Sequence, residues 1–174
     1  MINFNVYGLP GPQGSKSFKG RSKKTGKAIM VESSVKVKPW REAVKWAARQ
    51  AMEESVRDAI IQCVNHGLTF PPALPLDGPL VARMVFTLPK PKGAPKLRKT
   101  YADRKPDLSK LARSTEDALT DAGLIADDAR IVEFSRLAKV FPNEDPESLS
   151  CPGVRITITP QEALTVMGVK CSGA

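Results

Sequence analysis

The chain has 174 residues, a length typical of one domain with a full hydrophobic core. Lys and Arg outnumber Asp and Glu by 27 to 18, and the net charge of +9 favours nucleic acid as a partner, with a membrane surface second. No apolar run approaches the roughly 18 residues of a membrane span, and the three cysteines lack CxxC or Cys/His spacing, so we expect a cytoplasmic protein without structural zinc or a membrane partner.

The N-terminal region predicts a strand followed by a basic loop. Ile2 to Tyr7 alternates between apolar and polar residues and ends at a turn rich in Gly and Pro, which is typical of a strand. Residues 11–27 contain Gly, Ser, Lys and Arg with little to bury, so we expect a basic loop that is mobile without a ligand. Residues 28–31 predict a short strand after this loop.

A long helix is predicted next, because Pro39 suits a first helical turn and an apolar stripe begins at Trp40. The stripe continues to Val64 before a stop near Gly67, and we expect Cys63 and Trp46 to pack in the core.

The second half predicts strands on either side of one amphipathic helix. Residues 80–88 and 130–141 alternate as strands do, with Val132, Phe134, Ala138 and Val140 expected on one side of the second. A helix over residues 107–122 is bounded by a basic loop before it and Gly123 after it. With a last strand from Val154, the sequence predicts a single α/β (α+β) domain, a mixed sheet with two principal helices.

The predicted helix has a polar face opposite its apolar one. Four side chains lie there within about a third of a turn at 100° per residue, namely Ser109, Arg113, Glu116 and Asp117. Asp107 precedes the helix and Asp127-Asp128 follow it, so a compact fold could bring these carboxylates together around Mg²⁺, which prefers oxygen ligands. The same residues also fit simpler roles: a helix cap, a turn and a solvated face.

The central segment resembles the RusA family of Holliday-junction endonucleases, found in bacteria and especially in phages and prophages. The motifs that carry the resemblance are Lys105-Pro-Asp-Leu, the region around Arg113, residues 117–123 and Asp127-Asp128 before a Val-rich strand. The resemblance implies one RusA-like nuclease domain over residues 1–174, with a weakly specified tail at 160–174. It further implies a homodimer that uses Mg²⁺, or Mn²⁺ in its place, to cut two opposed strands of a four-way DNA junction in recombination and repair.

Carried over residue by residue, the resemblance assigns metal binding to Asp107, Asp127 and Asp128, and catalysis to Asp107, Arg113 and Asp128. Arg113 stands where the family often has a lysine, and arginine keeps the charge but cannot release a proton. Ser109 stands where the family usually has a second aspartate. Three interpretations stay open: Glu116 supplies the missing metal ligand, the site works with fewer ligands, or activity is lost. We favour Glu116, about two turns along the same face, because its longer side chain can reach back toward the start of the helix.

Basic residues provide the predicted DNA contacts, with phosphates as their targets. They are Lys16, Lys19, Arg21, Lys23, Lys24, Lys105, Lys110 and Lys139. A solvated hairpin is the simpler interpretation of residues 11–27. Two other functions remain open, a catalytically silent binder of branched DNA, suggested by Ser109, and a basic RNA-binding module. A nucleotide cofactor is not expected, because Gly11-Pro-Gln-Gly-Ser-Lys lacks the GxxxxGK[ST] spacing.

Overall fold

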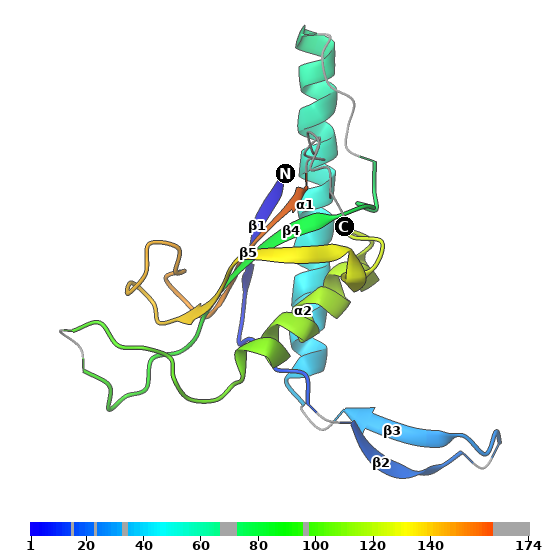
Figure 1. Ribbon diagram of the computed structural model, residues 1–174, viewed down its shortest axis with the longest axis vertical. Helices are drawn as coiled ribbons and strands as arrows, with labels where there is room; N and C mark the ends of the chain where they lie inside the picture. Colours follow the sequence, from blue (N-terminus) through cyan, green and yellow to red (C-terminus); the bar gives the residue numbers. More distant parts are fainter. Residues whose placement is uncertain (15, 23, 33–34, 67–72, 96–97, 162–174) are drawn as a thin grey trace, which may run out of the picture.

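The structure is a computed structural model that describes residues 1–14, 16–22, 24–32, 35–66, 73–95 and 98–161. Over these residues it forms a four-stranded sheet in the order β1-β6-β4-β5 and a separate two-stranded sheet, β2-β3 (Figure 1). The elements in chain order are β1 (Ile2–Tyr7), β2 (Lys16–Arg21), β3 (Ala28–Glu32), α1 (Val37–His66), β4 (Leu80–Thr87), α2 (Leu108–Ala122), the 3-10 helix η1 (Asp128–Arg130), β5 (Ile131–Val140) and β6 (Gly153–Pro160).

The larger sheet is mixed, as predicted, since β4 pairs in parallel with β5 and antiparallel with β6, while β1 pairs antiparallel with β6. Buried and partly exposed residues alternate at the start of β4, as the sequence pattern indicates. From Met84 onward both faces of β4 are buried. The reason is the segment after β5, where the backbone N–H of Leu149 donates to Oγ1 of Thr87 at 2.8 Å.

The prediction of which β5 side chains face the core is wrong at the start of the strand. Val132 is 61% exposed. Phe134 packs against the core as expected, and it does so together with Ile131 and Leu137, which were not predicted there. Pairing with β4 is irregular between Leu80 and Val81 and again between Ala82 and Arg83. Each irregularity shifts the alternation by one residue, and this breaks the simple two-residue period on which the prediction depended.

The two principal helices pack on each other and on the sheet, α1 beside β1 and α2 beside β5. Trp40 of α1 is buried, and its indole N–H donates to Oγ1 of Thr115 in α2 at 3.2 Å. Oγ1 of Thr115 donates in turn to the carbonyl of Leu111 at 2.9 Å. The mixed fold with two principal helices is therefore confirmed over the described residues.

The outer half of α1 departs from the prediction of a continuous buried stripe. The helix ends at His66, close to the expected stop, but its later turns extend past the sheet (Figure 1). Val64 is 80% exposed and Trp46 67% exposed, and Cys63 is exposed as well, so none of these three packs in the core. Among the described helices, none combines the length and apolar character needed to cross a membrane.

The basic segment after β1 contains a strand that the sequence pattern did not reveal. β2 pairs antiparallel with β3, and the hairpin projects away from the larger sheet (Figure 1). β3 matches the short strand predicted at residues 28–31. The mobility of residues 11–27 and the domain limits of 1–174 stay predictions, and residues 162–174 of the predicted tail lie outside the described part of the chain.

Candidate functional site

Asp107 stands immediately before the first turn of α2, where the preceding loop is tied to β5. The ammonium of Lys139 donates to the carbonyl oxygens of Arg104 at 2.7 Å and Pro106 at 2.9 Å. The Asp107 carboxylate forms an ion pair with Lys110 at 3.0 Å. This bond to Lys110, together with the charges of Lys110, Lys105 and Lys139, lowers the pKa of Asp107. The carboxylate is therefore ionised at neutral pH.

Asp127 and Asp128 follow the opposite end of α2. The helix ends at Gly123, whose φ of 81° lies in the left-handed region that glycine accepts without strain. The chain then pairs with Leu76, whose N–H donates to the carbonyl of Leu124 at 2.9 Å. Oδ1 of Asp127 accepts from the N–H of Ala129 at 2.9 Å, which caps η1 and leaves Asp128 exposed at its first position.

Glu116, in the middle of α2, is the one described carboxyl whose pKa is clearly raised. Burial is the main cause, and the negative charges of Asp128 and Asp117 raise the pKa further, against the opposing effect of Arg113. Asp117 itself accepts from Arg41 of α1 at 3.0 Å, so it has a role in holding the two helices together. Glu116, Asp128 and Arg113 thus form an electrostatically coupled group, which we call the Glu116 cluster.

Within one protomer the predicted site residues fall into two groups. A helix of 15 residues rises by about 22 Å, and Asp107 and Asp128 flank α2 at its two ends (Figure 1). Ser109, in the first turn, is exposed. No three His, Cys, Asp or Glu side chains gather as a metal-binding group in the described ranges. The sequence pattern correctly indicated the polar face, but it did not indicate that the charge of Asp128 acts on Glu116.

The Glu116 cluster has a donor set that suits Mg²⁺. Magnesium in proteins commonly takes one or two carboxylates and keeps its other positions for water and substrate phosphate. Glu116 and Asp128 provide two carboxylates whose mutual repulsion a cation would relieve, and this repulsion adds to burial, the main cause, in raising the pKa of Glu116. Asp127 adjoins this pair in sequence, although its Oδ1 already accepts from Ala129.

The predicted DNA-binding residues occupy two regions. Arg21 and Lys24 are exposed on the projecting hairpin, Lys16 and Lys19 belong to strand β2, and Lys23 lies outside the described residues. The other three lie near Asp107, where Lys105 and Lys110 are exposed while Lys139 is engaged with loop carbonyls. Lys139 therefore positions the loop beside Asp107.

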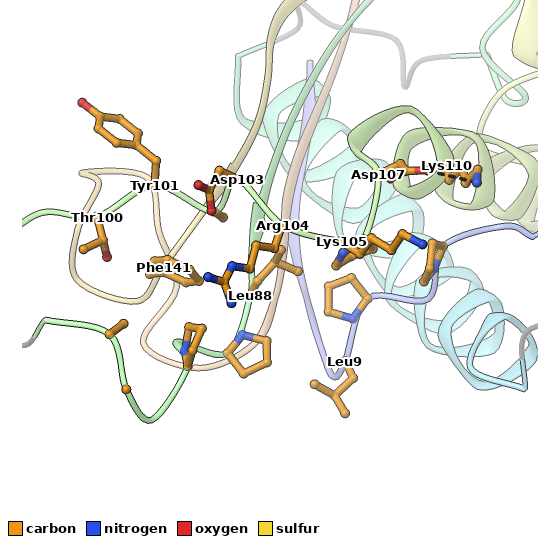
Figure 2. Close-up of a pocket in the computed structure, with 18 of the residues that line it drawn as sticks. Leu9, Leu88, Thr100, Tyr101, Asp103, Arg104, Lys105, Asp107, Lys110 and Phe141 are labelled. Carbon is orange, nitrogen blue, oxygen red and sulfur yellow. Dashed lines mark ion pairs between the residues drawn. The ribbon is translucent and has the colours of Figure 1, made fainter.

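A groove of about 1260 Å³ opens next to Asp107. In Figure 2, Arg104 and Lys105 extend from the loop before α2, Asp107 and Lys110 form their ion pair, and Leu9 approaches from the segment after β1. Gln13 and Phe141 also line the groove. Sequence reasoning identified the cations of this region but missed Gln13 and Phe141, because nothing in the local pattern indicates that segments 130 residues apart meet here.

Comparison with known protein families identifies the family of the chain. The family model described as Endodeoxyribonuclease RusA matches residues 10–159, which include both helices, the Glu116 cluster and most of the residues that line the groove. A comparison with curated proteins gives no match. Since the family match covers most of the sequence, the chain belongs to the RusA family of endodeoxyribonucleases.

Proposed function

We propose that the protein resolves four-way DNA junctions as a homodimer, with a divalent metal bound at each of two identical sites. The observation that carries the proposal is the coupled pair of Glu116 and Asp128 beside Arg113, in a chain of an endodeoxyribonuclease family. The net charge of +9 supports a polyanionic substrate. The setting would be DNA recombination or repair in bacterial cytoplasm, including that of a phage-infected host.

Each residue has a definite part in this proposal. Glu116 and Asp128 would hold the ion, and Asp127 would stand beside them. A bound Mg²⁺, or Mn²⁺ in its place, would supply a Lewis acid that activates water and offsets charge on the leaving oxygen. Arg113 would stabilise the scissile phosphate through its permanent charge. In this role Glu116 would supply the carboxylate that the family usually has at the position of Ser109.

The position of Asp107 favours a site shared between two protomers. Asp107 precedes α2, Glu116 lies within it and Asp128 follows it in η1, so we infer that one chain offers only part of the predicted ligand set at either place. A two-fold dimer in which α2 of one protomer lies against the end of α2 in the other would bring both parts together twice. It would also present two sites for two opposed strands.

Mixing variants tests this sharing directly. Asp107→Asn and Asp128→Asn should each lower junction cutting by about 100-fold or more. In a purified mixed dimer of the two variants, one shared site keeps both aspartates, so single-strand nicking should return. If each protomer instead carries a complete site, the mixed dimer stays as inactive as its parents.

Substrate class is tested by incubating the protein with a synthetic four-way junction, a linear duplex and a stem-loop RNA, with and without Mg²⁺. Paired symmetric nicks in the junction alone support the proposal. Tight junction binding without cutting, and recovery of cutting in Ser109→Asp, would favour the silent junction binder. Preference for the stem-loop would favour an RNA-binding module and contradict the proposal.

A further inference from the structure

The groove beside Asp107 combines a cationic rim with an apolar floor. The described cations that line it are Lys36, Arg98, Lys99, Arg104, Lys105 and Lys110, against two carboxylates, Asp103 and Asp107. Leu88 and Phe141 line its buried side at 6% and 7% exposure, and Leu9 adds an apolar side chain that is 54% exposed (Figure 2). Nucleotides have the same division of chemistry, since a charged phosphate is joined to a base with flat apolar faces.

Gln13 stands where the groove meets the first turn of α2. Its backbone N–H donates to the carbonyl oxygen of Lys110 at 3.0 Å, so the residue is fixed next to the ion pair of Lys110 and Asp107. Two residues earlier, Gly11 packs so closely on α1 that an added Cβ would lie 2.3 Å from the carbonyl oxygen of Lys36. The chain around Gln13 is therefore held in place by contacts with the start of α1 and with α2.

The side chain of Gln13 has a hydrogen-bond acceptor, its carbonyl oxygen, to which no group donates. Its Oε1 is buried and has no hydrogen-bond partner, one of two such side-chain atoms found over the described residues. Buried polar groups are nearly always satisfied, because burial without a partner is costly. Gln13 lines the groove, so rotation of its carboxamide toward the groove would let Oε1 accept from an N–H of a bound molecule.

We propose that the groove receives one unpaired nucleobase from the branch point and that Oε1 of Gln13 accepts from its exocyclic amino group. This inference rests on the proposed function. Bases at a branch point leave the stack more easily than bases in intact duplex. Cytosine at C4 and adenine at C6 carry an amino group where thymine and guanine carry a keto oxygen, so an acceptor that faces this position of the base selects the first two, whereas the amino group of guanine lies at C2. The cations on the rim hold the adjoining phosphates.

The test compares binding of junctions that differ in one nucleotide at the branch point, in EDTA so that cutting plays no part. The natural protein should bind the cytosine and adenine junctions about tenfold more tightly than junctions with the same bases lacking the amino group, as expected for one good contact to a base edge. Gln13→Met keeps the size of the side chain and removes its acceptor, so it should bind all of them equally. Gln50→Met, an identical change at an exposed position of α1, should keep the preference.

The outcomes separate this inference from the nuclease proposal. If the natural protein binds junctions with and without the amino group equally, or if Gln13→Met still discriminates, the role of Gln13 is wrong, whatever the cutting assay gives. If the preference depends on Gln13 but Mg²⁺ produces no cutting, the base contact stands and the nuclease proposal fails.

Discussion

At the scale of single residues, the ionised carboxylate of Glu116 lowers the stability of the fold, although the proposed metal site requires it. A carboxyl that is half-buried beside Asp128 and Asp117 costs free energy when it ionises, which is why its pKa is raised. For a carboxyl with a raised folded pKa, stability is lost as the pH rises from the ordinary pKa of glutamate, 4.5, through the folded pKa. At neutral pH the fold therefore carries this cost. Such a cost is expected where a cation is meant to bind.

Glu116→Gln should accordingly stabilise the metal-free protein at pH 7, by about 1–3 °C in Tm, a small gain because water still reaches the carboxyl. The natural protein should gain about 1.4 kcal/mol when Mg²⁺ is present at ten times its Kd, and Glu116→Gln should lose most of this gain. Thermal unfolding with and without Mg²⁺ measures both effects. Glu133→Gln, at an exposed position of β5, is the control and should leave both unchanged. A full Mg²⁺ response in Glu116→Gln would remove Glu116 from the metal site.

At the scale of elements, the sequence predicted helix α2 almost completely. Its apolar residues recur at helical spacing, and Gly123 ends it in the left-handed conformation as expected. The residue pattern of one element does not show which of its residues a second element will bury. For this reason the sequence did not predict the exposed outer turns of α1 or the shifted inward face of β5. The same limit applies to the site. The polar face of α2 could be read from spacing, whereas the approach of Asp128 to Glu116 depends on how the chain turns after Gly123.

The segment between β1 and β2 is predicted to depend on the absence of a side chain at Gly11. A Cβ there would lie 2.3 Å from the carbonyl oxygen of Lys36 and 3.0 Å from Cβ of Trp40, so the backbone must move. Gly11→Ala should cost about 1–3 kcal/mol of unfolding free energy, the usual range for overpacking. Gly93→Ala provides a matched control in the same groove, because nothing lies within 4 Å of its added Cβ, and its effect should stay within about 0.5 kcal/mol. Equal urea midpoints for the two variants would contradict the close approach at Gly11.

The loop after β5 is predicted to weaken in acid. Lys90 lowers the pKa of Glu144, Arg136 that of Asp145 and Arg83 that of Glu147, in each case through a side-chain bond. For a carboxyl with a lowered folded pKa, the stabilisation is present above the unfolded value and is lost as the pH falls through the folded one. Stability should thus hold from pH 7 to about 5 and decline below the ordinary glutamate pKa of 4.5.

Glu147→Gln tests the origin of this decline. The variant should be less stable than the natural protein at pH 7, and the difference should shrink toward pH 3, where the natural glutamate is protonated too. Urea unfolding across this range measures the difference, with Glu54→Gln on exposed α1 as a control that should show none. A difference that does not change with pH would assign the effect to packing and not to charge.

At the scale of the whole molecule, two groups of cations stand out, one on the projecting hairpin and one on the rim of the groove. If about six phosphates are neutralised per protomer, the logarithm of the binding constant should fall with the logarithm of salt at a slope near −5. Arg21→Gln, on the exposed hairpin, should reduce the slope by about 0.9, because it removes one phosphate contact.

Lys139→Gln should behave differently. Its ammonium donates to the carbonyls of Arg104 and Pro106, so its loss should weaken junction binding by disturbing the loop beside Asp107 while the slope stays nearly the same. Fluorescence titrations from about 50 to 200 mM salt distinguish the two variants. A slope that is reduced equally in both would contradict the positioning role and show that Lys139 contacts a phosphate.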